Sequence, residues 1–377
     1  MTAVAGWTVR SIIGFLAIGT LLVAVGCSPR GRAQFAYATD ATNNIRAYTV
    51  DASNGALTPA APESFPADAT CVAVDPAGKF AYAIDDNDGS ISAYGINATS
   101  GALTPVAGAR SAAGSSPVFL AVDPMGKFLY VANATTASVA AYTIDAASGA
   151  LTPVAGSPFA AGRHPESIAA DPSGKFLYVV NYNSSDVSAY AIDPSSGALK
   201  QVAGSPFRAG SNPDDLAIDR AGKFVYVTNG GAKSAVSARR ANSEGVSAYT
   251  IDPASGALTP AAGSPFGAGD SPQALAIDPA GKFVYVVNDD DNTISAYAID
   301  ATSGGLTPLA GSPVPVHRGS DALAIEAAGK FAYVSSVESD SIFAYAIDAT
   351  TGALTPIAGS PFAPGTEPTC ITFTRPP

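Results

Sequence analysis

The stretch Asp171-Pro172-Ser173-Gly174-Lys175-Phe176 decides the fold, because versions of it recur along most of the chain. Successive copies of its Gly-Lys-Phe core are separated by 48, 48, 48, 59 and 48 residues and begin at Gly78, Gly126, Gly174, Gly222, Gly281 and Gly329. This period is too long for ankyrin or tetratricopeptide arrays and is typical of β-propeller blades, each of which is one four-stranded sheet. The repeat therefore predicts an all-β propeller.

One repeat divides into four short strand-like segments separated by turn residues. In the third copy these segments are 166–170, 176–181, 187–192 and 198–203. In the turn between the first two, Pro172 supplies a φ near −65° and Gly174 the positive φ that a tight hairpin needs, and a similar turn joins the last two. Both turns emerge on one face of the disc. The other two connections of each blade lie on the opposite face, where we expect the functional surface.

The two ends of the chain together contain a seventh blade. Residues 35–39 and 45–49 have the pattern of a second and a third strand, but no first strand precedes them. The missing strand is 368–373, which aligns with the first strand 69–74 of the next blade. We predict that the C-terminal strand completes the N-terminal blade and closes the ring, which removes exposed sheet edges. The seven blades are counted by Tyr37, Tyr82, Tyr130, Tyr178, Tyr226, Tyr285 and Tyr333.

Composition supports this fold and excludes several functions. The 37 glycines, 29 prolines and 47% hydrophobic residues suit many short buried strands in a single domain, residues 34–377. Net charge is −11, and six of the eight lysines are repeat lysines dispersed around the ring, so we expect no nucleic-acid partner. The sequence has no glycine-rich phosphate loop, no Gly-x-Ser-x-Gly elbow and no zinc cluster. We therefore expect neither a cofactor nor a metal.

Residues 1–27 differ from the rest and are excluded from the fold. Arg10 is followed by an uncharged stretch that ends Ala24-Val25-Gly26-Cys27. This segment resembles a bacterial lipoprotein signal, which implies that Cys27 is acylated and that 28–33 is a tether. An ordinary signal peptide and an uncleaved anchor are the alternatives. Each of these predicts a propeller outside the cytoplasm, as an exported monomer; in the lipoprotein case it touches the membrane only through its lipid.

Two further cysteines, Cys71 and Cys370, occupy equivalent positions in neighbouring blades. An exported protein offers an oxidising environment in which they could pair. Rotation-related side chains point in the same sense around the ring, however, which makes disulfide geometry hard to reach. We expect two buried thiols that act as small hydrophobic residues.

Candidate functional residues are found where the repeats differ. Two positions of the connection between blades vary from repeat to repeat. The first position is occupied by Asp68, Ser116, His164, Asn212, Ser271, Gly319 and Glu367. The second position, two residues later, is occupied by Thr70, Val118, Glu166, Asp214, Gln273, Asp321 and Thr369. The connections between blades are expected to surround one mouth of the central channel, and charged and titratable side chains are concentrated on one side of it. They are Arg163, His164 and Glu166 as catalytic candidates, with Asp214 and Asp215 as substrate-binding candidates.

Residues 34–377 resemble the lactonase-like seven-bladed β-propeller family, which includes 6-phosphogluconolactonase-type members, and the related YVTN-repeat propellers. The YVTN motif occurs as Tyr226-Val227-Thr228-Asn229. A lactonase-like blade reads Gly-x-His-Pro-His-Ser, then Asp-Pro-x-Gly-Arg-Phe, then Asp-Leu-Gly-x-Asp-Arg. Here His164 and Asp186 match this signature, whereas Glu166, Asn181 and Val187 replace its second His, first Asp and Arg. The resemblance implies a seven-bladed fold and lactone hydrolysis.

Opening a lactone needs a base that activates water and a donor that stabilises the oxyanion. His164 with Glu166 could supply the base, and Arg163 or Arg318 the oxyanion contact. His317 and Arg318 lie three blades further on, so we expect them across the mouth as substrate-binding residues. The alternative is that all these are ordinary polar loop residues. The protein would then be a non-catalytic envelope propeller that binds a protein or a glycan instead of a small lactone.

Two other features are candidate binding sites. The acidic segments 85–89 and 289–292 could offer oxygen ligands to calcium, but they lack EF-hand spacing and match tight-turn chemistry, which we favour. An 11-residue insertion within 230–244 adds three positive charges to an acidic face. It is a second possible binding loop or a tolerated insertion.

Overall fold

The computed structural model describes residues 33–67, 69–108, 110–231, 245–363 and 365–374. The expected leader with Cys27 and most of the insertion, 232–244, lie outside these residues. All described strands belong to one compact unit, Arg32–Pro377. Every regular element in these ranges is a strand, and they contain no helix of the length and hydropathy that crossing a membrane requires.

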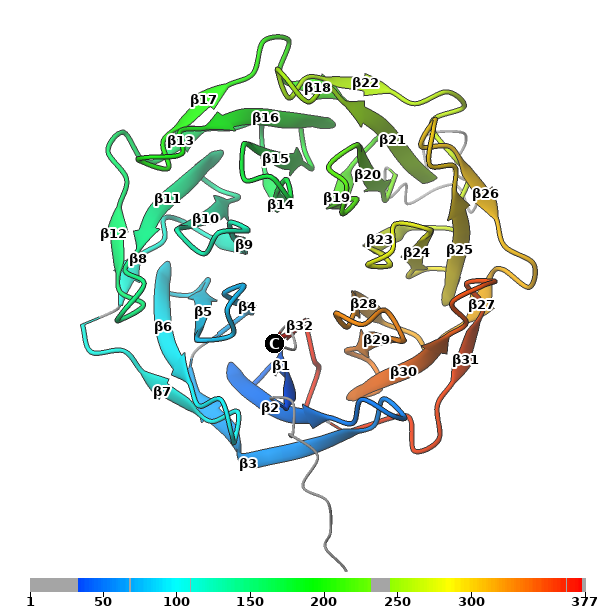
Figure 1. The fold of residues 1–377 in the computed structure, drawn as a ribbon, viewed down its shortest axis with the longest axis horizontal. Coiled ribbons are helices and arrows are strands. Elements are labelled where there is room, and N and C mark those ends of the chain that lie inside the picture. The colour runs from blue at the N-terminus through cyan, green and yellow to red at the C-terminus, as the bar shows by residue number, and fades with distance from the viewer. Residues whose placement is uncertain (1–32, 68, 109, 232–244, 364, 375–377) are drawn as a thin grey trace, which may run out of the picture. The chain divides into compact units, whose positions relative to one another are not determined.

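Seven antiparallel sheets form a closed ring around a central channel, as the repeat predicts (Figure 1). The innermost strands are β32 Cys370–Phe373, β4 Cys71–Val74, β9 Pro117–Val122, β14 Pro165–Ala170, β19 Pro213–Ile218, β23 Pro272–Ile277 and β28 Ser320–Ile325. The second strands are β1 Gln34–Thr39, β5 Phe80–Asp85, β10 Phe128–Asn133, β15 Phe176–Asn181, β20 Phe224–Asn229, β24 Phe283–Asn288 and β29 Phe331–Ser336.

The outer half of each blade has a long and a short strand. The third strands are β2 Asn44–Val50, β6 Ser90–Ile96, β11 Ser138–Ile144, β16 Asp186–Ile192, β21 Gly245–Ile251, β25 Thr293–Ile299 and β30 Ser341–Ile347. The outermost strands are β3 Leu57–Pro66, β7 Leu103–Pro105, β12 Leu151–Pro153, β17 Leu199–Gln201, β22 Leu258–Pro260, β26 Leu306–Pro308 and β31 Leu354–Pro356. Four two-residue strands also pair with third strands, namely β8 Ser111–Ala112, β13 Phe159–Ala160, β18 Phe207–Arg208 and β27 Val314–Pro315.

The predicted ring closure is confirmed. The C-terminal strand β32 pairs antiparallel with β1, from Thr39 opposite Cys370 to Ala36 opposite Phe373. Backbone N–H of Phe35 donates a hydrogen bond of 2.8 Å to the Thr374 hydroxyl, which extends the junction beyond the strand. The N-terminal blade is therefore completed by the last strand of the chain, which pairs the inner edge of β1.

A ring of tyrosines connects neighbouring blades. The seven second-strand tyrosines are fully buried, and each hydroxyl donates to a glycine carbonyl in an outer turn of the next blade. The circuit closes where Tyr333 of the last blade donates to Gly55 of the first, at 2.8 Å. Gly55 has φ +76°, and a Cβ there would lie 2.6 Å from the Phe331 ring. Glycine is required at this turn because the neighbouring blade packs directly on it.

The connections of each blade divide between the two faces of the ring, as the turn residues predict. On one face, Asp171 Oδ1 accepts hydrogen bonds from the backbone N–H groups of Lys175 and Phe176, both at 2.7 Å, and so fixes the first turn. On the other face, the backbone N–H of Tyr182 donates to the His164 carbonyl at 2.8 Å, which joins the middle loop of a blade to the connection between blades.

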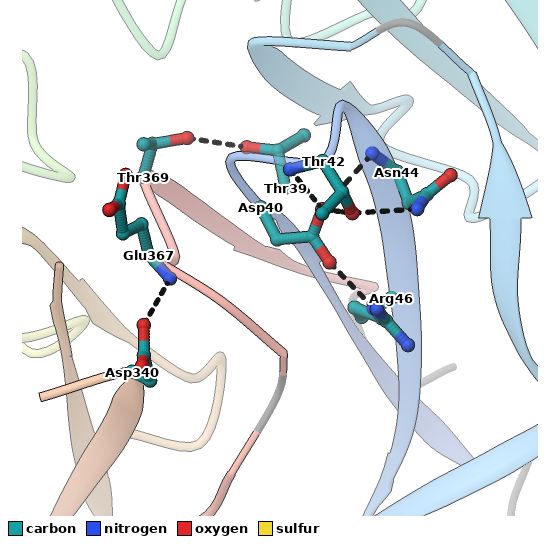
Figure 2. Close-up of polar contacts among 8 residues, drawn as sticks. All are labelled: Thr39, Asp40, Thr42, Asn44, Arg46, Asp340, Glu367 and Thr369. Atoms are coloured by element: carbon teal, nitrogen blue, oxygen red, sulfur yellow. Dashed lines mark hydrogen bonds and ion pairs between the residues drawn. The ribbon is translucent and has the colours of Figure 1, made fainter.

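An ion pair between a buried aspartate and a partly exposed arginine stabilises the closing blade (Figure 2). The Asp40 side chain is fully buried, and its Oδ2 lies 2.7 Å from Nε of Arg46. Its Oδ1 accepts hydrogen bonds from Thr42 and from the backbone N–H of Asn44 at 3.2 Å. Burial alone would raise the pKa of Asp40, but the Thr42, Arg46 and Asn44 contacts outweigh it and hold the pKa below its ordinary value. The carboxylate therefore stays charged.

The expectation of two free thiols is wrong. Cys71 and Cys370 form a disulfide, and their Cα atoms are 5.3 Å apart. This separation lies within the ordinary range for a bridge. The argument from rotational symmetry considered only the direction of the two side chains and not how close their backbones lie at the start of β4 and β32. The bridge ties the last strand of the chain to the second blade.

Candidate functional site

A cavity of about 440 Å³ occupies one end of the channel, where the innermost strands begin. We call it the acidic mouth. The second varying position of the repeat contributes a lining residue from every blade, namely Thr70, Val118, Glu166, Asp214, Gln273, Asp321 and Thr369. The repeat register thus identifies the channel-facing position in all seven blades.

The lining of the acidic mouth carries charge of one sign. Glu166, Asp214, Asp215 and Asp321 contribute carboxyl groups, and the lining contains no Lys, Arg or His. The hydroxyl groups of Thr70 and Thr369 donate to the backbone carbonyls of Ile84 and Thr70. The amide of Gln273 makes one long contact with Asp289, at 3.4 Å. The Cys71–Cys370 disulfide is also part of the wall. This arrangement disfavours an anionic ligand.

Glu166 and His164 lie together at the rim. Oε2 of Glu166 is 3.1 Å from Nε2 of His164, an ion-pair distance, although the approach lacks the direction of a hydrogen bond. Burial raises the pKa of Glu166, and the neighbouring His164 partly opposes that rise. The His164 ring lies 5.8 Å from the Tyr182 ring. The sequence hypothesis that these two residues meet is consistent with this geometry.

The backbone of His164 has a structural explanation. Its φ is +58°, in the left-handed region that most residues avoid. The equivalent residues adopt the same conformation, with φ from 48° to 66° at Ser116, Asn212, Ser271, Gly319 and Glu367. Positive φ is therefore a property of the connection between blades, and it gives no separate sign of a catalytic role.

Four of the sequence candidates do not line the acidic mouth: His164 lies at its rim beside Glu166, and the three others make contacts elsewhere. Arg163 is exposed, and its guanidinium donates to the Asn183 carbonyl at 3.0 Å. Arg318 is exposed and lies 3.5 Å from Glu338. His317 stacks on Phe343, with ring centroids 4.1 Å apart. None of the three lines the cavity, so we leave them out of the proposed site.

Asp215 connects three blades at the cavity wall. Its Oδ1 accepts a hydrogen bond of 2.8 Å from the Ser167 hydroxyl of the preceding blade, and Oδ2 accepts one of 3.0 Å from the backbone N–H of Leu275 in the next. Burial raises its pKa, while these bonds oppose the rise. Ser167 is thereby held by a carboxyl group. The sequence identified Asp215 but gave no signal for its partners, which come from other blades.

Asp214 lies beside the start of the insertion. A Cβ on Gly230 would come within 2.3 Å of Oδ2 of Asp214, so the two residues pack closely. The insertion itself, from 232 on, is outside the described residues, and its predicted binding role stays a prediction.

The acidic segment 85–89 forms a turn. Backbone N–H of Asn87 donates to Asp85 Oδ1 at 2.9 Å, and Arg110 lies 3.5 Å from Asp85 and contacts Asp88. Across the described ranges no three His, Cys, Asp or Glu residues gather in a way that could hold a metal ion.

The fold and the mouth define a seven-bladed propeller that is closed by its C-terminal strand and carries a polar cavity at one end of its channel. The family model "Lactonase, 7-bladed beta-propeller" matches residues 35–140, 120–212 and 203–321, and the chain belongs to this family. No curated protein sequence matches the chain.

Solved structures share the fold at low identity. A proposed 6-phosphogluconolactonase from Bacteroides uniformis is 18% identical, with a TM-score of 0.76, over 92% of this chain and 100% of its own. A second one, from Bacteroides fragilis, is 20% identical, with a TM-score of 0.73, over 91% and 98%. The periplasmic gluconolactonase of Pseudomonas aeruginosa is 20% identical, with a TM-score of 0.75, over 92% and 99%. At these identities the likeness shows the fold alone.

Proposed function

We propose that the protein hydrolyses an uncharged lactone at the acidic mouth, with Glu166 as the general base. The observation that carries the proposal is a carboxyl group of raised pKa that lines a cavity in a lactonase-family propeller. A base is most effective when its pKa is moved toward the working pH, and burial moves Glu166 in that direction.

The charge of the mouth selects the substrate class. Four carboxyl groups and no cation line the cavity, so a phosphorylated lactone would be repelled, whereas a neutral sugar lactone would not. The same charge acts on the product, because ring opening converts a neutral ester into a carboxylate. Repulsion of this new anion favours its release.

The reaction needs only water and the lactone. Glu166 takes a proton from water while the water oxygen bonds to the carbonyl carbon. The ring carbon–oxygen bond then breaks, and the ring oxygen takes the proton back as an alcohol. The Gln273 amide, which keeps a second N–H beside its contact with Asp289, is the uncharged donor on the wall that suits the developing oxyanion. His164 acts as a positioning residue for Glu166.

Action outside the cytoplasm is part of the proposal. Its support is the lipoprotein-like segment 1–27 and the name of a structural neighbour, a periplasmic gluconolactonase. That neighbour is named for a lactone without phosphate, whereas the two Bacteroides neighbours are named for a phosphorylated one, so the choice between the two substrates rests on the charge of the mouth.

The test compares ring opening of glucono-δ-lactone and its 6-phosphate by the wild type, Glu166→Gln and the matched control Asp321→Asn. Both variants remove one carboxyl charge from the same ring of lining residues. We expect Glu166→Gln to lower kcat by about 100-fold or more and Asp321→Asn by much less. We also expect preference for the unphosphorylated lactone. Equal losses of kcat in the two variants would overturn the role of Glu166. Binding of the sugar without ring opening would instead indicate a carbohydrate-binding propeller.

The pH profile provides a second readout. Because burial raises the pKa of Glu166, kcat/KM should rise with pH through an inflection above the ordinary glutamate range. His164 opposes that rise, so His164→Ala should move the inflection to higher pH. An inflection that stays in place would exclude the proposed coupling.

A further inference from the structure

A second and larger cavity, of about 740 Å³, occupies the opposite end of the channel. We call it the turn-side cavity, because it is formed where the innermost strands end and the first turns begin. Most of its lining side chains are apolar, among them Val74, Val122, Ile218, Ile277 and Phe373, and prolines form its rim, but polar atoms make up a large part of the exposed wall. A volume of this size lies in the range of small-molecule sites.

Arg220 interrupts this apolar rim. Four copies of the first turn begin with Asp-Pro, and their prolines are Pro76, Pro124, Pro172 and Pro279. The copy that begins at Asp219 has Arg220 in place of proline. Arg220 is exposed and lines the cavity, and among the described residues its guanidinium has no hydrogen-bond or ion-pair partner.

The turn itself does not need the arginine. Its internal bonds run from the N–H of Gly222 to the Asp219 carbonyl, at 2.9 Å, and from the N–H of Ala221 to Asp219 Oδ2, at 3.2 Å. Neither bond uses a group of Arg220, and proline fills the position in four of the other turns and Ala327 in a fifth. A structural role therefore leaves the choice of arginine unexplained.

The acidic residues of the cavity are already engaged. Asp75 and Asp278 also line it, but each carboxylate accepts three backbone N–H bonds from its own turn, at 2.6–3.1 Å. Arg220 is therefore the one charged lining group, among those described, whose hydrogen-bonding capacity is unused.

We propose that the turn-side cavity binds a small organic anion with an apolar body, with its acidic group on Arg220. A guanidinium pairs well with carboxylate or sulfonate, and the aliphatic wall would cover the remainder of the ligand. The lining of the acidic mouth holds no cation, whereas this lining includes a guanidinium beside two carboxylates that their own turns engage. The proposal is independent of the lactone activity.

The experiment titrates the full chain with the fluorescent aromatic sulfonate ANS and with N-phenyl-1-naphthylamine, a neutral probe. Arg220→Pro restores the repeat, and Lys223→Ala is the matched control, because it removes an exposed cation from the same turn outside the cavity. We expect one ANS site whose Kd weakens about tenfold in Arg220→Pro, the equivalent of about 1.4 kcal/mol, and is unchanged in Lys223→Ala. The neutral probe should bind both variants equally.

A third variant tests whether both probes bind in the turn-side cavity. Ala327 lines the turn-side cavity, so Ala327→Phe should fill part of it and weaken both probes, while urea unfolding confirms that each variant folds. Equal weakening of ANS by Arg220→Pro and Lys223→Ala would overturn the proposal in favour of diffuse surface charge. Absence of saturable ANS binding to the wild type, or binding that Arg220→Pro leaves unchanged, would also overturn it.

Discussion

Removal of the disulfide should destabilise the propeller strongly, because the bridge closes almost the whole chain into one loop. The perturbation is the double substitution Cys71→Ser with Cys370→Ser. Both residues lie on innermost strands at the acidic mouth, and 299 residues separate them in sequence. The expected effect is a lower free energy of unfolding with the fold retained, since β32 still pairs with β1 in the absence of the bridge.

The magnitude follows from the loop that the bridge closes. In the chain-entropy relation, a loop of this length restricts the unfolded chain by about 19 cal/mol/K, or about 6 kcal/mol at 25 °C. Measured losses are typically about 2–4 kcal/mol, because unfolded chains retain structure and are more restricted than the relation assumes. We therefore expect a loss of about 3–5 kcal/mol.

The assay is urea unfolding of wild type and double variant, each with and without a reducing agent. Reduction should shift the wild-type transition to that of the variant and leave the variant unchanged. A variant within about 1 kcal/mol of the oxidised wild type would refute the reasoning, because the stability would then lie in the β1–β32 junction alone and the covalent loop would contribute little.

Three further outcomes are expected. Tyr333→Phe should cost about 1–2 kcal/mol in urea unfolding, because it leaves the buried Gly55 carbonyl without its donor. Arg46→Met should cost about 2–3 kcal/mol near neutral pH, since it leaves the Asp40 carboxylate buried without its cation. The pKa of Asp40 is lowered in the folded protein, so this stabilisation is present above the ordinary aspartate pKa and is lost as pH falls through the folded value; the difference between Arg46→Met and wild type should shrink in acid. Cys27→Ser should move the protein from the detergent phase to the aqueous phase of a bacterial extract, and unchanged partitioning would reject lipidation at this residue.

The fold could be predicted from the sequence because every local signal repeats. Each blade restates the same turn chemistry, so an error in one copy is corrected by the others, and the alignment of the C-terminal strand with 69–74 located the closure. The two-residue strands, such as Phe159–Ala160, were missed because a pattern needs more residues than they contain. The disulfide was missed for a different reason. Symmetry relates blade to blade, but the approach of two innermost strands depends on how tightly the channel closes.

The candidate site was predictable in part. Register alone found the seven positions that line the acidic mouth, because one alternating position of each first strand faces the channel. Register could not predict where the side chains of Arg163 and Arg318 point. Both residues lie in connections where the backbone is not extended and side chains do not alternate. Arg163 turns to the Asn183 carbonyl of its own blade, and Arg318 pairs with Glu338. Contacts made by such loop residues depend on neighbours that the repeat does not specify.

The two ends of the channel show how a symmetric ring acquires distinct chemistry. Groups that hold the blades together, such as the tyrosine circuit, recur in all seven copies and leave no freedom for specialisation. At the acidic mouth the variable position collects carboxyl groups, whereas at the turn-side cavity a single proline-to-arginine change introduces a cation into an apolar rim. If both proposals hold, a neutral lactone enters one end and the other end holds an anion. Charge would then keep the anion away from the acidic mouth, because four carboxyl groups line that end.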